Sequence, residues 1–180
     1  MADGDLSLRA SLFRIEKTNE RNTDPLITSY YLMSGKRHSQ GIELEAAGRI
    51  TDRWEVFAGL TRMNSKIDEA AGASANNAGK MPRYTPKVTA NVWTTYALTP
   101  EWTVGGGLTH VGKRYASEAN TNYLPAYTTA ALMVGYENRR HHVQLNVNNL
   151  FNKRYWDGAY GGHAVPGANR ELTLSYGYKF

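Results

Sequence analysis

The sequence predicts an all-β fold, an antiparallel up-and-down set of about eight strands of the transmembrane β-barrel type. Three observations predict it: apolar and polar residues alternate, short and long connections alternate, and aromatic residues gather near strand ends. In residues 171–180, every even position is apolar or aromatic and every odd position is small, polar or charged. Because successive side chains of a strand point to opposite faces, this segment has one apolar and one polar face.

The same period-two alternation recurs along the rest of the chain. Trp102, Val104 and Leu108 form one such stripe, with Thr103 and Thr109 on the opposite face. We expect strands at roughly 6–17, 36–49, 54–67, 86–98, 102–115, 126–137, 141–151 and 170–180.

The connections between these strands alternate in length. Short turns fall near 49–53, 99–101 and 137–140, whereas long polar loops fall at 18–35, 68–85, 116–125 and 152–169. Short periplasmic turns at one end and long extracellular loops at the other are typical of a membrane barrel. The loop at 68–85, rich in Ala, Gly, Ser and Asn, is expected to be flexible.

Aromatic side chains gather at both strand ends, as in barrels that cross two membrane–water interfaces. The short-turn ends carry Trp54, Tyr96, Trp102, Tyr136, Tyr178 and Phe180, and the long-loop ends carry Tyr84, Tyr115, Tyr123, Tyr155 and Trp156.

Composition excludes several classes of function. There are no cysteines, so disulfides and thiolate metal sites are excluded, and the net charge of +5 is too dispersed to predict nucleic-acid binding. No pair of the five histidines has the i, i+4 spacing of a helical metal site, and the adjacent His141 and His142 point to opposite faces of a strand. We expect no metal, no cofactor and no catalytic constellation, and therefore not an enzyme.

Alternation alone leaves open which face of the barrel is apolar. A soluble ligand-binding barrel turns its apolar stripe inward, whereas an outer-membrane barrel turns it toward lipid. The polar stripe is rich in Thr, Ser, Gly, Asn and Gln, which suits a wet lumen, and the apolar stripe contains Ala10 and Gly106. Both features favour lipid on the outside.

Several segments then resemble one family. Residues 146–156, which read NVNNLFNKRYW, closely resemble the penultimate-strand motif of TonB-dependent siderophore receptors. The Gly-rich loop, the PGANR segment at 166–170 and a final strand ending in Phe180 follow in the family's order. FRIEKTN at 13–19, GIELE at 41–45 and PRYTP at 82–86 resemble other family segments, so the resemblance covers almost the whole chain.

The resemblance implies a receptor of the bacterial outer membrane that imports ferric siderophores and is driven by the TonB complex. The family barrel has about 22 strands around a plugged lumen. Residues 1–180 therefore look like a C-terminal portion of the barrel domain, without the plug domain and the TonB-contacting segment. The resemblance further implies contact with outer-membrane lipid and a last strand, marked by Leu172, Leu174, Tyr176, Tyr178 and Phe180, that the barrel-assembly machinery reads.

Ligand contacts are expected only in the long loops. Stacking on a ferric chelate favours Tyr123, Tyr155, Trp156, Tyr160 and His163, with packing within the loops as the alternative for each. The chemical class of siderophore stays open. A self-contained eight-stranded outer-membrane barrel with a structural or adhesive role is the competing hypothesis, since an even strand number permits closure. The first residues do not resemble a signal peptide, which favours a segment of a longer protein.

Overall fold

The structure, a computed structural model, describes residues 5–160 and 163–180. Within these residues no helix is long and apolar enough to cross a membrane. The elements are β1 (Leu6–Thr23), β2 (Tyr31–Thr51), β3 (Trp54–Glu69), the 3-10 helix η1 (Gly72–Asn77), β4 (Val88–Ala97), β5 (Trp102–Val111), β6 (Arg114–Tyr115), β7 (Tyr123–Leu124), β8 (Tyr127–Glu137), β9 (His141–Asn148), β10 (Trp156–Tyr160), β11 (His163–Pro166) and β12 (Glu171–Tyr178).

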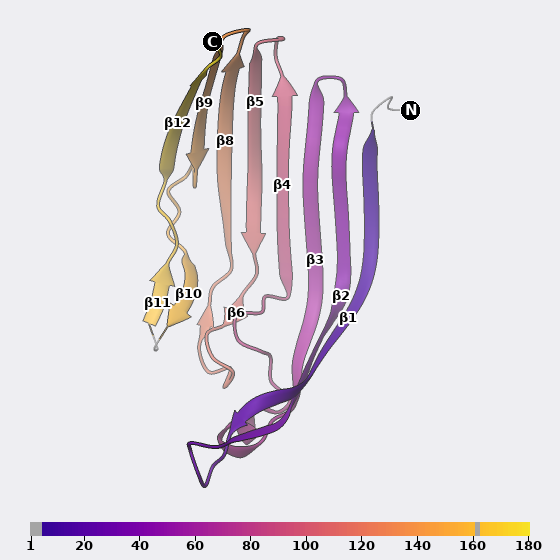
Figure 1. Ribbon diagram of the computed structural model, residues 1–180, viewed down its shortest axis with the longest axis vertical. Coiled ribbons are helices and arrows are strands. Elements are labelled where there is room, and N and C mark those ends of the chain that lie inside the picture. Colours follow the sequence, from indigo (N-terminus) through magenta and orange to yellow (C-terminus); the bar gives the residue numbers. More distant parts are fainter. Residues whose placement is uncertain (1–4, 161–162) are drawn as a thin grey trace.

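Eight of these strands form one antiparallel sheet in the order β1-β2-β3-β4-β5-β8-β9-β12 (Figure 1). Each strand pairs with the next main strand along the chain, which confirms the up-and-down topology. The other four strands form two small hairpins, β6–β7 and β10–β11, inside the long connections. In the described residues β1 and β12 are the outer strands and do not pair with each other, so the sheet is open. The competing hypothesis of a closed eight-stranded barrel is therefore not supported.

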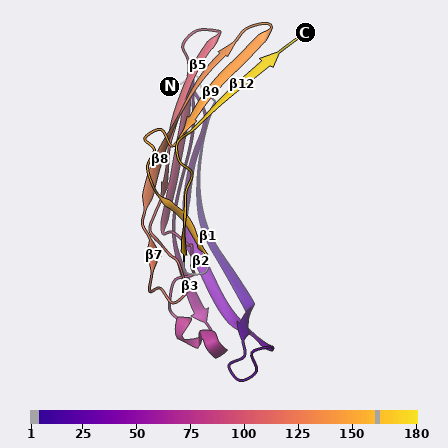
Figure 2. The same cartoon turned by 90° about the vertical axis from the view of Figure 1, so that its left-hand side faces the viewer.

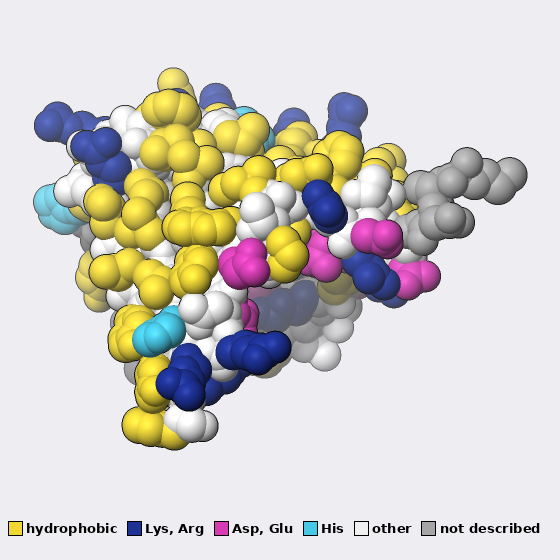
Figure 3. All heavy atoms as spheres, turned by 90° about the horizontal axis from the view of Figure 1, so that it is seen from above, with side chains coloured by type: hydrophobic (Ala, Val, Ile, Leu, Met, Phe, Trp, Pro, Cys, Tyr) yellow, Lys and Arg dark blue, Asp and Glu magenta, His cyan; other side chains and the backbone are white. Residues whose placement is uncertain are grey.

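The sheet is curved (Figure 2). Its two faces differ in chemistry. The strand register aligns Leu8, Ala46, Ala58, Val92 and Leu108 across five neighbouring strands. Residues directly opposite one another share a face, so the apolar stripes merge into one band. Seen from the short-turn end, hydrophobic side chains cover the outside of the arc and charged side chains gather in its hollow (Figure 3). The expected orientation, with the apolar face outward, is confirmed.

This outward band leaves the chain almost without an apolar core of its own. Among the described residues only Ile67 and Leu124 are buried hydrophobic side chains. Leu12 is 84% exposed and Leu174 is 70% exposed. Contiguous apolar surface of this extent requires an apolar environment, which the hydrocarbon of a bilayer supplies.

The inner face is less polar than the sequence suggests. Trp93 lies across the glycine run at 105–107: a Cβ at Gly107 would stand 2.6 Å from Trp93 Cε3, and one at Gly105 would stand 3.1 Å from Trp93 Cζ2. A Cβ at Gly107 would also stand 2.4 Å from the Val92 carbonyl oxygen, so this position has to be glycine, whereas a Cβ at Gly105 would only crowd the indole. Phe57 is in register with Trp93 on this face.

The aromatic residues of the short-turn ends form the expected belt. Trp102 and Tyr136 are paired across β5 and β8 with ring centroids 5.0 Å apart, and Trp54 is in register with Tyr96. The aromatics of the long-loop ends instead contact loop residues: Tyr155 packs on Tyr127, Tyr84 bonds to Ala159, and Tyr115 and Tyr123 flank Lys113. That these residues also form a second belt stays a prediction.

The first long connection differs most from expectation. Residues 18–35 were expected as a loop, but β1 continues to Thr23 and β2 starts at Tyr31, leaving a loop of 24–30. A register irregularity after Lys17 interrupts the alternation, with Asn19 at φ 54°, which explains why period two did not reveal the extension. Ion pairs then hold it: Glu20 accepts hydrogen bonds from Lys17 and Arg37.

Glu20 lies in this extension, beyond the membrane-spanning part of β1. Burial by itself would raise the pKa of its carboxyl group. The hydrogen bonds and positive charges of Lys17 and Arg37 outweigh burial and hold the pKa below the usual glutamate range. Glu20 is therefore ionised at neutral pH and bridges two strands of the extended hairpin.

Candidate functional site

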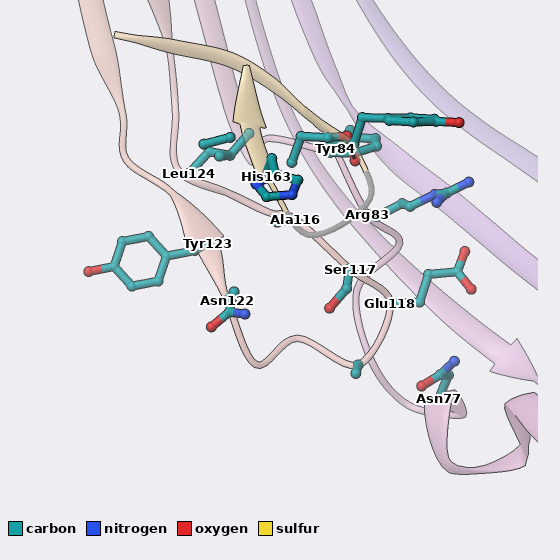
Figure 4. A pocket seen from close by; sticks show the side chains of 14 residues that line it. Asn77, Arg83, Tyr84, Ala116, Ser117, Glu118, Asn122, Tyr123, Leu124 and His163 are labelled. Atoms are coloured by element: carbon teal, nitrogen blue, oxygen red, sulfur yellow. Dashed lines mark hydrogen bonds between the residues drawn. The ribbon is translucent and has the colours of Figure 1, made fainter. Parts of the chain in front are cut away.

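A cavity of about 890 Å³ lies at the long-loop end of the sheet (Figure 4). Three connections meet around it: the one between β3 and β4, the one between β5 and β8, and the β10–β11 hairpin. The residues that line it are Asn77, Arg83, Tyr84, Ala116, Ser117, Glu118, Ala119, Asn122, Tyr123, Leu124, Ala159, Tyr160, His163 and Ala164.

The first two connections are locked together by the side chain of Asn120. Its Oδ1 accepts from the Met81 N–H at 2.9 Å, and its Nδ2 donates to the Met81 carbonyl at 2.8 Å. The amide group thus pairs with both polar groups of one backbone unit, as a neighbouring strand would. Next to this contact the Tyr84 N–H donates to the Tyr115 carbonyl at 2.9 Å. One wall of the cavity is therefore built from two loops that behave as a single piece.

The β10–β11 hairpin is held by a buried arginine. The Arg114 side chain is only 6% exposed, and its Nη2 donates to the carbonyls of Trp156 at 3.0 Å and Asp157 at 2.5 Å. Its guanidinium group lies 5.6 Å from the centroid of the Tyr127 ring. The Tyr84 hydroxyl also donates to the carbonyl of Ala159, which ties the hairpin to the opposite wall.

The motif at 146–156 builds the base of the same hairpin. Asn149 is buried, with φ 47°, and its Nδ2 donates to the carbonyls of Lys153 and Ala168, both at 2.9 Å. Its Oδ1 accepts from the Lys153 N–H at 2.9 Å. Asn152, also left-handed, accepts from the Arg170 N–H at 2.9 Å. The two asparagines therefore hold the two ends of the loop between β9 and β12 together at its base.

The cavity carries a positive charge that is not neutralised locally. Glu118 on its wall accepts a hydrogen bond from Arg37 at 3.0 Å, so that carboxylate is already paired. Arg83 has no acidic partner in residues 5–160 and 163–180, and its guanidinium carbon lies 5.6 Å from the Tyr84 ring centroid. An anionic ligand with flat rings would find both a cation and aromatic faces here.

Three of the five residues expected to bind ligand line this cavity: Tyr123, Tyr160 and His163. Figure 4 shows His163 close to Tyr84 near the centre, whereas the ring of Tyr123 points outward. Tyr155 and Trp156 do not line it. The Tyr155 ring instead packs against Tyr127, with centroids 4.2 Å apart and planes tilted by 32°, and it lies over the glycine at position 167. Whether any of these residues binds ligand stays a prediction.

Sequence reasoning missed Arg83, Tyr84 and Glu118 as cavity residues. The PRYTP segment at 82–86 was interpreted only as a segment that resembles the family, with Tyr84 as an aromatic of the long-loop end. Its two prolines, which keep the flanking residues out of regular pairing, were the available signal. The structure places Leu172, Leu174, Tyr176 and Tyr178 in register with the outward residues of β9, as their alternation predicts. Within the described parts of the chain, no group of three or more His, Asp or Glu side chains could hold a metal ion.

Comparison with known proteins agrees with this architecture. The family model described as TonB dependent receptor-like, beta-barrel, matches residues 1–150. The siderophore receptor PiuA of Acinetobacter baumannii is 36% identical over 99% of this chain, and the catecholate siderophore receptor Fiu of Escherichia coli is 33% identical over 85%. The ferrioxamine receptor of Yersinia enterocolitica is 35% identical over 84%.

Solved structures give the same result. The crystal structure of PiuA superposes on 97% of this chain with a TM-score of 0.88 at 34% identity, and that of Fiu in its closed form with a TM-score of 0.81 at 29% identity. The chain spans only 20–25% of the length of these curated relatives. It belongs to the TonB-dependent receptor β-barrel family, a family of outer-membrane receptors.

Proposed function

We propose that the whole protein is an outer-membrane receptor that imports ferric siderophores with energy from the TonB complex. Residues 1–180 contribute a C-terminal portion of its barrel wall, and the plug and the TonB-contacting segment belong to other parts of the protein. Support comes from the relatives named as siderophore receptors and from the open sheet, whose two free edges suit continuation into a larger barrel. The relatives are receptors, so we propose a binding role rather than a catalytic one.

The loop cavity is proposed as part of the site that the ligand meets first. The observation that carries this is the cavity itself, in which three loops present Arg83, Tyr84, Tyr160 and His163 to one space of about 890 Å³. The positive charge favours a ferric chelate of negative charge, and the aromatic rings favour a chelator that has rings. A tris-catecholate complex of iron(III) satisfies both conditions, whereas a cationic tris-hydroxamate complex satisfies neither.

The experiment is a binding titration on the complete receptor that carries this chain, followed by intrinsic fluorescence quenching. The iron(III) complex of a tris-catechol chelator is compared with that of a cationic tris-hydroxamate. We expect tighter binding of the catecholate and a loss of roughly tenfold in its affinity in Arg83→Gln, because a charge-assisted contact is removed. Arg139→Gln, which removes an exposed arginine at the short-turn end, should leave the affinity unchanged.

Equal affinity of wild type and Arg83→Gln for the catecholate complex would exclude the cavity as a ligand site. No binding of either complex would count against the receptor function itself.

The remaining partners are proposed on the same basis. The final strand, with Tyr176, Tyr178 and Phe180, is proposed as the segment that the barrel-assembly machinery reads. Tyr178 packs edge-on against Phe180 at the short-turn end of the sheet, with centroids 5.1 Å apart, and this contact supports the proposal.

A further inference from the structure

The outer face of β1–β3 changes from apolar to basic toward the long loops. Leu12, Ile42 and Arg62 are in register across the three strands. The next row on the same face contains Arg14, and the row after it contains Lys66. Arg62 and Lys66 are both exposed, on the side of the sheet that carries the leucine band and not in its hollow.

The height of these side chains places them at the outer edge of the membrane. Arg62 lies eight residues and Lys66 twelve residues beyond Trp54 of the short-turn belt. At about 3.4 Å per residue and a tilt of about 40°, these steps correspond to roughly 21 Å and 31 Å along the membrane normal. The apolar band of such barrels is about 25 Å tall. The two cations therefore lie on either side of the boundary between hydrocarbon and headgroups.

The charges of this cluster do not cancel. Arg14 bonds to Glu16 at 2.6 Å and to Gln40 at 2.5 Å, so it is held in the plane of the surface. Arg62 and Lys66 have no acidic partner in the described part of the chain. The cluster contains four Lys or Arg side chains against three carboxylates: Arg14, Lys36, Arg62 and Lys66 against Glu16, Asp68 and Glu69. Lys36 lies 3.8 Å from Glu16 and is in register with Glu69, so the cations without an acidic partner are Arg62 and Lys66.

An apolar trough of about 600 Å³ lies on the membrane side of the cluster. It forms because short side chains are set between long ones in two neighbouring rows. Its outward lining includes Leu8, Leu44 and Leu60 around Ala10, Ala46 and Ala58. It runs beneath the basic cluster along the same strands, in the part of the band where lipid tails lie.

We propose that this surface binds an anionic, phosphate-bearing lipid of the outer leaflet, with the phosphate at Arg14, Arg62 and Lys66 and one acyl chain in the trough. Arg62 and Lys66, which have no acidic partner in the described residues, complement a lipid phosphate at headgroup height, since Arg and Lys make charge-assisted hydrogen bonds to its oxygens. Arg14, already bonded to Glu16, adds a third cation beside them. The apolar trough directly below complements the tail of the same molecule. The proposal needs only the membrane location and does not depend on which ligand the receptor carries.

The test measures lipid retention by the complete, delipidated receptor in a mild detergent, using native mass spectrometry. The probe is a multiply acylated glycolipid that carries two phosphates, compared with the same glycolipid after both phosphates are removed. We expect selective retention of the phosphorylated form, and a loss of about tenfold or more in the double variant Arg62→Gln and Lys66→Gln. Ala58→Phe, which fills the trough, should weaken retention several-fold without a change of charge.

The matched control removes two exposed arginines at the other end of the sheet, through Arg53→Gln and Arg139→Gln, and should retain the lipid as wild type does. Equal retention of the phosphorylated and phosphate-free lipids would overturn the proposal, as would equal retention by wild type and the Arg62/Lys66 variant. Displacement of the glycolipid by millimolar inorganic phosphate would identify a free-anion site and would also overturn it. Unchanged retention by Ala58→Phe would show that the trough does not hold the acyl chain, and would overturn that part of the proposal.

Discussion

Asn149 shows how one buried side chain fixes a functional loop. Its amide satisfies two carbonyls and one N–H that belong to both ends of the connection between β9 and β12. Because buried polar groups without partners are costly, the closed base of this loop depends on the Asn149 amide. A left-handed backbone, with φ 47°, suits asparagine better than most residues.

Asn149→Asp should destabilise the base of this loop. An ionised carboxylate keeps the acceptor for Lys153 but loses both donors and faces two carbonyl oxygens. We expect the free energy of local opening of residues 150–170 to fall by about 1–3 kcal/mol, measured by amide hydrogen exchange in the complete receptor. Asn148→Asp is the control, because Asn148 is an exposed neighbour and the change of charge is the same. If the amides of residues 150–170 exchange at the wild-type rate in both variants, the base of the loop does not depend on Asn149.

Among the elements, the long connections are more ordered than their composition suggests. The segment at 68–85 contains the 3-10 helix η1 and is fastened to its neighbour through Met81 and Asn120. The connection between β9 and β12 contains a hairpin held by Arg114. These contacts give the cavity walls a defined relative position before any ligand enters.

Asn120→Asp should separate the two loops that share a wall. The variant loses the donor to the Met81 carbonyl and sets a carboxylate against the carbonyls of Ser117 and Glu118. We expect exchange of the Met81 amide to accelerate by roughly tenfold to a hundredfold, together with weaker binding of the ferric tris-catecholate. Asn19→Asp is the control: Asn19 is also left-handed, and no side-chain hydrogen bond of it is found in the described residues. Wild-type exchange at Met81 in Asn120→Asp would show that the loops are joined by other contacts.

For the molecule as a whole, the sequence predicted what depends on neighbours two residues apart. Stripes such as Leu172 and Leu174 revealed the strands and, with the small polar residues opposite, the outward face. Local alternation does not predict contacts between segments that are distant in the sequence. Asn120 binds a residue 39 positions away, and Arg114 binds residues 42 and 43 positions away. Tyr155 was expected at the ligand because nothing local reveals that Gly167 leaves room for its ring against the hairpin base.

The central claim is that these eight strands are an incomplete wall with two free edges. The most direct measurement is refolding of the isolated 180-residue chain into detergent or lipid vesicles, followed by electrophoresis with and without boiling. Because β1 and β12 leave unpaired backbone groups in the membrane, we predict aggregation and no folded monomer band. A sharp monomer band that shifts on boiling would contradict the account, since it would mean that the eight strands close on themselves.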